Sequence, residues 1–308
     1  TAGAQQAFDL LARILVTPAS TAGSRGGTVV AVEDPGYPPL RHVFAAAGAR
    51  LVGVPVDDEG MSVAAIPKAA GIICVTPSHQ FPLGAVLSLR RRSALLDLAR
   101  SRNAIIIEDD YDSEFRFDGQ PLDALQTLDR HGAVFYVGTF SKSLFPELRL
   151  GYVVVPAWAR PALLAAKQLI DWHSPLLLQN TLADFIAEGH LARHVRKMRR
   201  IYAGRRAALL DALARHAGAR LQPIPAMAGL HLAARLTDQP ATKSGEPADQ
   251  RLAAAARDLG LRFDYANRYR LTATEDSNKR EAGALIFGYG QIEEDAIAPA
   301  IKRLAKLL

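Results

Sequence analysis

The chain has 308 residues, of which 49% are hydrophobic and 22% charged, a balance that suits a globular protein with one large core or a large and a smaller domain. No apolar run approaches the roughly 20 residues of a membrane-spanning helix, and the first residues lack the layout of a signal peptide, which together indicate a cytoplasmic protein with no membrane partner. The net charge of +6 and the pI near 9.5 favour an anionic partner only if the basic residues gather on a binding face.

Apolar runs bounded by turn residues alternate with helical patterns through the first half of the chain. Helices are expected over residues 4–16 and 89–102. The strand-like runs are rich in Val and Ile and apolar on both faces, so they predict an α/β fold with a buried, mainly parallel sheet. Cys74 lies in one of these runs and fits a buried, unreactive thiol in a reducing compartment. The expected strands are residues 28–35, 49–57, 71–77, 104–110, 133–140 and 149–156.

After Pro156 the pattern changes to long helices and short strands, which predicts a smaller C-terminal α+β domain. We expect a large α/β domain over residues 1–175, and a long connecting helix with the small domain over 176–308. The chain runs directly into its first helix, so the N-terminal part of the large domain is expected to be missing. The expected helices are 157–171, 178–217, 248–260 and 293–308, the strands are 219–225, 229–236 and 284–292, and the exposed loops are 17–28 and 237–250.

Much of the positive charge lies in residues 191–209, LARHVRKMRRIYAGRRAAL. Apolar residues, among them Val195, Met198 and Tyr202, recur there every three or four positions, as in an amphipathic helix whose outer face is basic. A solvated or subunit-facing surface is the favoured interpretation, and a contact with nucleic acid is the alternative.

Polar motifs follow four of the expected strands: EDPGYP, TPSHQFPLG, EDDYDSEF and GTFSKS. In a mainly parallel sheet such motifs meet at the carboxyl ends of the strands, where ligands bind. Lys142, in GTFSKS, is expected to be poorly solvated at this junction and therefore suited to lose its proton and form a Schiff base. The sequence thus predicts pyridoxal 5'-phosphate as a covalently attached cofactor, with Lys142 as the catalytic residue and no metal.

This cofactor also needs a cradle for its phosphate. The helix start at Gly3-Ala4-Gln5 offers backbone N–H groups to an anion. Ser141 can add a hydroxyl, and Arg149, at the start of the strand 149–156, can add a guanidinium fork.

The cofactor ring has candidate partners in three motifs. Asp109, at the end of the run AIIIEDD, would keep the pyridine nitrogen protonated, with Glu108 and Asp110 as open alternatives. Tyr111 lies on the same face of an extended chain and can bond the ring hydroxyl. The other candidates are Tyr37, between prolines, for stacking, and His79 for the ring hydroxyl or the opposite face; Asp112 and Glu114 fit solvated or supporting groups.

Together these residues resemble fold type I pyridoxal-phosphate enzymes of the class I/II aminotransferase group. More closely, they resemble the aminotransferase-like domain of MocR-type transcriptional regulators in the GntR superfamily. The motifs that carry the resemblance span nearly the whole chain: TAGAQQAFDLLARIL, VEDPGYP, VTPSHQFPLG, IEDDYDSEFRFDG, YVGTFSKSLFPELRLGYVVVP, HVRKMRRIYAGRR and LIFGYGQI.

The resemblance implies an aldimine on Lys142, Asp109 at the pyridine nitrogen, Tyr111 at the ring hydroxyl, Tyr37 on the ring face and Arg149 at the phosphate. It also implies a homodimer in which the subunits share residues near the site. In these regulators a winged helix-turn-helix binds DNA, and this element is expected to be absent from the present chain.

The chain departs from typical aminotransferases at Phe81, where many of them carry an asparagine directed at the ring hydroxyl. The departure puts efficient transamination in doubt. By the same resemblance, Arg268 is expected to bind the carboxylate of an amino acid, with Arg270 and Arg280 as alternatives.

The expected function is therefore an effector-sensing domain that binds pyridoxal phosphate and responds to an amino acid or amine. The alternative is an active aminotransferase that passes an amino group to a 2-oxo acid, so enzymatic activity stays open and is expected to be weak or vestigial. The sequence does not identify the effector.

Overall fold

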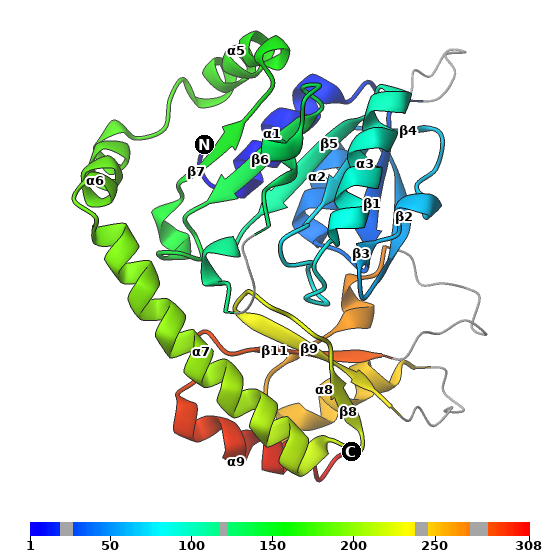
Figure 1. The fold of residues 1–308 in the computed structure, drawn as a ribbon, viewed down its shortest axis with the longest axis vertical. Helices are drawn as coiled ribbons and strands as arrows, with labels where there is room; N and C mark the ends of the chain where they lie inside the picture. The colour runs from blue at the N-terminus through cyan, green and yellow to red at the C-terminus, as the bar shows by residue number, and fades with distance from the viewer. Residues whose placement is uncertain (19–26, 118–121, 238–245, 272–282) are drawn as a thin grey trace.

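The computed structural model describes residues 1–18, 27–117, 122–237, 246–271 and 283–308, which form two sheets with packed helices (Figure 1). Parts of the two loops that we expected to be exposed, 17–28 and 237–250, lie outside these residues. Within the described residues, no helix combines the length and apolar character required to cross a lipid bilayer.

The first sheet has seven strands in the order β3-β2-β1-β4-β5-β6-β7. Its five inner strands are parallel, and the edge strands β3 and β7 run antiparallel to their neighbours. The carboxyl ends of β1, β4, β5 and β6 therefore meet at one edge, as the sequence predicted. The strands are β1 (Val29–Asp34), β2 (Arg50–Asp57), β3 (Gly60–Met61), β4 (Ala70–Val75), β5 (Ile105–Asp110), β6 (Val134–Thr139) and β7 (Gly151–Val154).

Helices cover both faces of this sheet because its inner strands are apolar on both sides. Ile73 and Val75 of β4 pack in a cluster with Leu95 of α3 (Leu89–Arg102). Ile72 and Cys74 point the other way, into a cluster with residues of α1 (Ala4–Leu15) and α2 (Pro38–Ala46). Cys74 is thus buried, as predicted. A single turn of helix, α4 (Leu125–Leu128), precedes β6.

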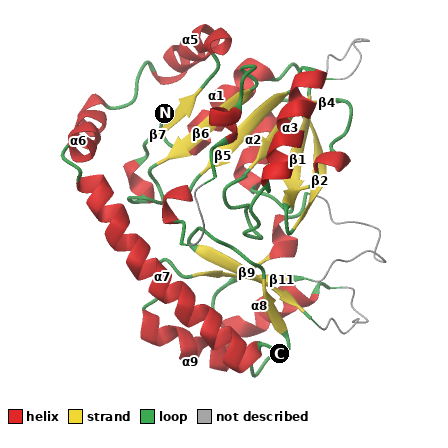
Figure 2. Ribbon diagram, in the orientation of Figure 1, coloured by secondary structure: helices red, strands yellow, loops and turns green. Residues whose placement is uncertain are grey.

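The second half forms an antiparallel sheet of four strands, in the order β10-β11-β9-β8. The connecting helix predicted over 178–217 is two helices, because Gly189 at φ +73° ends the first one. Figure 2 shows β9 and β11 beyond the carboxyl edge of the large sheet, with α7 running along both parts. The elements are α5 (Arg160–Asp171), α6 (Leu176–Ala187), α7 (His190–Ala217), β8 (Leu221–Pro223), β9 (His231–Leu236), α8 (Ala248–Asp258), β10 (Asp264–Tyr265), β11 (Ala284–Gly288) and α9 (Glu294–Leu304).

Helix α7 is amphipathic as predicted: Val195, Met198 and Ile201 pack against the core of the small sheet, and Tyr202 is buried in it. Arg196, Lys197 and Arg200 lie on the exposed side. These described residues match a solvated or subunit-facing helix.

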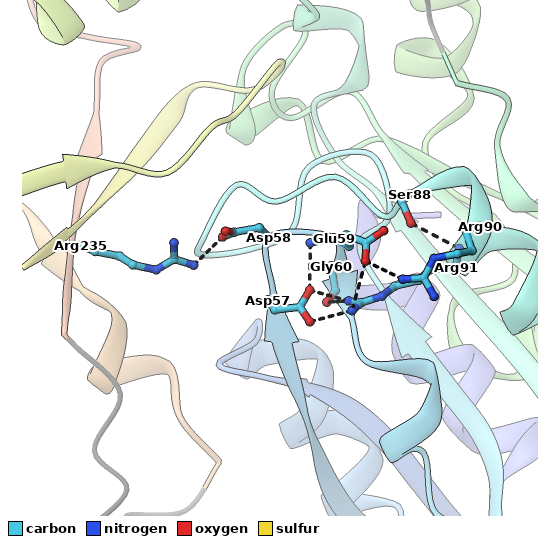
Figure 3. A network of polar contacts seen from close by, with 8 residues as sticks. All are labelled: Asp57, Asp58, Glu59, Gly60, Ser88, Arg90, Arg91 and Arg235. Atoms are coloured by element: carbon cyan, nitrogen blue, oxygen red, sulfur yellow. Dashed lines mark hydrogen bonds and ion pairs between the residues drawn. The ribbon is translucent and has the colours of Figure 1, made fainter.

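Polar contacts join the two sheets. Arg235 on β9 forms an ion pair with Asp58, in the turn between β2 and β3, with 2.6 Å between nitrogen and oxygen (Figure 3). Beside it, Arg91 of α3 donates to both carboxylate oxygens of Asp57 at 2.6 Å, which fixes the base of that turn. Such exposed pairs contribute at most about 1 kcal/mol each. The pair of Arg235 and Asp58 therefore orients the two sheets relative to each other more than it stabilises the fold.

Candidate functional site

A cavity of about 420 Å³ lies at the carboxyl edge of the parallel strands. The loops after β1, β4, β5 and β6 and the start of α1 line it from the large sheet, and Leu230, His231 and Gly288 line it from the small one. All but two of the predicted cofactor-binding residues line this one cavity: Ala4, Gln5, Tyr37, Asp109, Tyr111, Ser141, Lys142 and Arg149. The two that do not are Gly3 and His79.

Lys142 lies in the turn that follows β6 and faces the cavity. It makes no hydrogen bond or ion pair within the described part of the chain, so its amine is available for chemistry. The expectation that it is poorly solvated is wrong for this chain, because Lys142 is exposed.

Asp109 closes the inner end of the cavity and is 4% exposed. One of its carboxylate oxygens, Oδ1, is buried without a hydrogen-bond partner among the described residues. Burial, with smaller effects from Asp110, Glu33 and Asp112, raises the pKa of Asp109 well above its usual range. A buried carboxylate so crowded by other carboxylates is suited to a cationic partner, and a protonated pyridine nitrogen is one.

Another part of the cavity lining is suited to receive an anion. Helix α1 begins there after Gly3, at φ +76°, and no side chain caps its first N–H groups. A Cβ at Gly3 would lie 3.1 Å from the nearer terminal nitrogen of Arg149, so glycine lets the guanidinium approach the helix start. Ser141 adds a hydroxyl that accepts a hydrogen bond from Thr139. This combination of helix dipole, guanidinium and hydroxyl fits a phosphate.

Arg149 reaches this position by a local conformation that the sequence did not reveal. It adopts φ +50°, in the left-handed region, and β7 begins only at Gly151. The expectation that Arg149 opens the strand is therefore wrong by two residues. Its side chain donates to the carbonyl of Ala2, which anchors the chain start to the site.

Aromatic side chains form a further part of the cavity wall. Tyr37, at the start of α2, meets Phe81 edge to face with ring centroids 5.5 Å apart. Phe81 is surrounded by further rings, those of Tyr111, His231 and Tyr269. The position where many aminotransferases carry a polar side chain is thus part of an aromatic wall.

His79 lies behind the cavity wall and not in it. Its ring is 1% exposed and its Nδ1 bonds the carboxylate of Asp112. The structure therefore does not place this imidazole where it would contact a ring in the cavity. Two residues that do line the cavity, Asp112 and His231, were not predicted to do so. Asp112 lay in a quoted motif, whereas the sequence around His231 held no signal.

The arginine predicted for a substrate carboxylate does not reach the cavity. Arg268 pairs with Asp264 at 2.6 Å on the small sheet. Arg270 donates to Asn267 and faces a different cavity, and Arg280 lies outside the described residues. Among the described residues that line the main cavity, Arg149 is the only arginine.

The site thus combines an available amine, a buried unpaired carboxylate, an anion cradle and an aromatic wall, all of which fit pyridoxal phosphate. Fold and site together define a fold type I pyridoxal-phosphate-dependent transferase-like protein, which confirms the predicted fold class and cofactor.

The profile of the family described as aminotransferase class I and II matches residues 4–270, and the chain belongs to this family. The probable rhizopine catabolism regulatory protein MocR of Rhizobium meliloti is 41% identical over 76% of this chain and 46% of its own length. The HTH-type pyridoxine biosynthesis transcriptional regulator PdxR of Corynebacterium glutamicum is 32% identical over 96% of this chain and 60% of its own length. The predicted resemblance to MocR-type regulators is thereby confirmed, and the chain spans about half the length of these relatives.

Among solved structures, the kynurenine aminotransferase of Pyrococcus horikoshii, in complex with PMP, is 27% identical with a TM-score of 0.85. The match covers 99% of this chain and 73% of that one. The aminotransferase fold is therefore present over almost the whole chain.

Proposed function

We propose that this chain is the effector-sensing domain of a MocR-type transcriptional regulator, that it binds pyridoxal phosphate and that it responds to an amino acid or amine. The observation that carries the proposal is the cavity itself. It pairs the free Lys142 amine with the unpartnered Asp109 carboxylate, in a chain whose curated relatives include helix-turn-helix regulators about twice as long.

Each residue has a defined task in this proposal. Lys142 supplies the amine that holds the cofactor covalently, and Asp109 keeps the pyridine nitrogen protonated. The start of α1, Ser141 and Arg149 hold the phosphate. The bound cofactor supplies an electron sink for bonds at the carbon that carries the effector's amino group.

In this proposal the small domain contacts the bound effector and changes its position when the effector binds. Leu230 and His231 reach the cavity from residues 176–308, which we propose as the small domain with its connecting helix, whereas the cofactor residues lie in 1–175. An effector that contacts both parts favours the closed arrangement over the open one. In the longer protein this change would alter how a homodimer presents its DNA-binding domains. Arg268 would join the carboxylate only if closure broke its pair with Asp264.

The first test is the visible spectrum of the chain mixed with pyridoxal phosphate. The wild-type chain should develop the absorbance of a lysine-bound cofactor, resistant to dialysis. Lys142→Ala should lose it, whereas Lys68→Ala, which removes an exposed amine that does not line the cavity, should retain it. An unchanged band in Lys142→Ala would refute the assignment of the amine.

A second candidate function is aminotransferase activity, favoured by the similarity to a solved kynurenine aminotransferase over the whole chain. The same spectra decide between the two. An amino acid that shifts the spectrum once without continued turnover, in the presence of a 2-oxo acid, supports the sensor. Rapid multiple turnover with that acid supports the enzyme.

A further inference from the structure

Asp112 and His79 form a buried pair that the proposed function does not use. The carboxylate lies 3.0 and 3.2 Å from Nδ1 of His79, and both residues are about 1% exposed. The other ring nitrogen, Nε2, is buried without a hydrogen-bond partner in the described part of the chain. A neutral imidazole satisfies this arrangement best with its proton on Nδ1, donated to Asp112, because a proton on Nε2 would have no acceptor.

Close contacts with the surrounding chain hold the imidazole ring of His79 in one position. A Cβ at Gly229 would lie 1.9 Å from Cε1 of His79, and one at Gly84 would lie 3.3 Å from Nε2. The ring of His231 covers another side, with centroids 4.4 Å apart. His79, Asp112 and His231 offer three ligand atoms within 4.8 Å of one another, and the two imidazole rings are tilted by 39°.

The pair reaches the cavity through Tyr111. The phenol of Tyr111 lines the cavity, donates to the backbone carbonyl of His79 at 2.9 Å and lies 3.1 Å from Nδ1 of the same residue. The phenol oxygen is therefore held at two points by one residue. The single Nδ1–H, held by Asp112, can also be shared with the phenol oxygen as a bifurcated donor, which frees the phenol proton to turn toward a stronger acceptor in the cavity.

We propose that Asp112 and His79 are positioning residues that hold the Tyr111 hydroxyl as a hydrogen-bond donor to the ring oxygen of bound pyridoxal phosphate. The inference deepens the proposed function and rests on it. Asp112 acts on the cofactor site through two hydrogen bonds, from Nδ1 of His79 to Asp112 and between Nδ1 and the Tyr111 hydroxyl, and not by its charge alone. The other charged or titratable groups around this unit are Asp109, Asp110, Glu33, His231 and Lys142.

The sign of a pKa shift tests the proposal. A donor to the ring oxygen weakens that oxygen's hold on the proton shared with the lysine nitrogen, so Tyr111→Phe should raise the pKa at which the visible band of the bound cofactor titrates. Asp112→Asn should also raise this pKa, by about one unit, because the substitution frees the Tyr111 phenol from the position in which it donates to the ring oxygen. A charge acting directly has the opposite effect, since removing a nearby anion destabilises the protonated cofactor and lowers the pKa.

The experiment is a pH titration of the visible absorbance for four proteins: wild type, Tyr111→Phe, Asp112→Asn and the double variant. The proposal requires that Asp112→Asn raise the pKa in the wild-type background and not in the Tyr111→Phe background. If Asp112→Asn lowers the pKa in both backgrounds, or shifts it equally upward in both, the proposal is wrong.

Glu108→Gln is the matched control. Glu108 is a fully buried carboxylate on β5, the strand that precedes Asp112, and it does not line the cavity. It accepts from the backbone of Leu125 and Gln126, so its substitution should leave the titration unchanged. If Asp112→Asn does not fold, His79→Gln gives the same comparison with and without Tyr111. A wild-type chain with no visible band would overturn the proposed function itself, whereas an unshifted band would overturn only this inference.

Discussion

At the scale of single residues, the site concentrates carboxylates that lack cationic partners. Glu33 is buried at the end of β1 and accepts from the backbone and hydroxyl of Thr76 and from Gln80. Burial nevertheless raises the pKa of Glu33 to about 7, because those bonds do not offset its loss of hydration. The Glu33 carboxylate in turn helps to raise the pKa of Asp109, which lies close by. A cationic ligand at Asp109 relieves this repulsion, which gives the cofactor a stabilising role in the fold.

Glu33→Gln should therefore flatten the pH dependence of stability in the cofactor-free chain. The folded-state pKa near 7 lies above the usual value of about 4.3, so protonation favours the folded state. In the wild-type chain, Glu33 makes its full contribution to the free energy of unfolding below about pH 4.3. This contribution, up to about 3 kcal/mol, is lost as the pH rises to about 7. Urea unfolding at pH 5 and pH 8 measures the difference. Asp97→Asn, at an exposed carboxylate, should leave the wild-type slope intact, and an equal slope in Glu33→Gln would contradict the argument.

At the scale of elements, the loop before β9 is shaped by what lies beneath it. Gly229 adopts φ +95° and its missing Cβ leaves room for the buried His79 ring. Its carbonyl also accepts from the buried hydroxyl of Tyr289. The small sheet can approach the large one here only if this residue has no side chain.

Gly229→Ala should be much more costly than Gly260→Ala. Gly260 also has a positive φ, +70°, but nothing lies within 4 Å of the Cβ position. Strain alone should cost about 1–2 kcal/mol at either site, and the clash with His79 should add about 1–3 kcal/mol at Gly229. Chemical denaturation of the two variants gives the comparison. Equal losses would mean that the loop moves aside freely.

The same elements show what the sequence could reveal. The helix expected over 89–102 is found over those residues because its ends carry local signals: Ser88 accepts from the backbone of Arg91, and Asn103 adopts the left-handed conformation at the other end. Helix α2 was not predicted, since it is short and starts with two prolines.

Parallel topology explains why most of the site was found. Motifs after parallel strands must meet at one edge, so Asp109, Tyr111 and Lys142 could be grouped from strand assignments alone. His231 comes from the other sheet, and its approach to His79 depends on how the two sheets dock. Arg268 failed to reach the cavity for the same reason. No local pattern encodes that docking.

At the scale of the whole molecule, Arg41 joins the large sheet's side of the site to the segment that precedes β11 of the small sheet. This buried side chain of α2 donates to the carbonyls of Tyr269 and Arg270, at 2.7 and 2.9 Å. Asp34, at the end of β1, accepts from the backbone of Leu271. The turn that carries Tyr37 is therefore bound on both sides to residues 269–271, which couples the aromatic wall of the cavity to the part of the chain that carries the small sheet.

Two helices at one side of the molecule, α5 and α6, leave most of their apolar side chains exposed in the single chain. Helix α5 has no buried residue, and α6 buries only Leu182. Both helices stand away from the two sheets (Figure 1). Their exposed apolar side chains include Leu164, Leu169, Ile170, Leu176, Leu177 and Ile186. An amphipathic helix that leaves most of its apolar side chains exposed in its own chain is typical of a surface covered by another protein, and we propose a second copy of this chain.

The variant Leu169→Glu/Leu177→Glu should therefore convert a dimer into a monomer. The two side chains are 86% and 79% exposed in the single chain, so the charges cost its fold little, whereas burying both in an interface without partners would be strongly unfavourable. Light scattering or sedimentation at about 10 μM measures the mass. Leu89→Glu is the matched control, because Leu89 is 60% exposed on α3 and its substitution should leave a dimer. A wild-type monomer at that concentration, or a double variant that still dimerises, would show that these helices are not the interface.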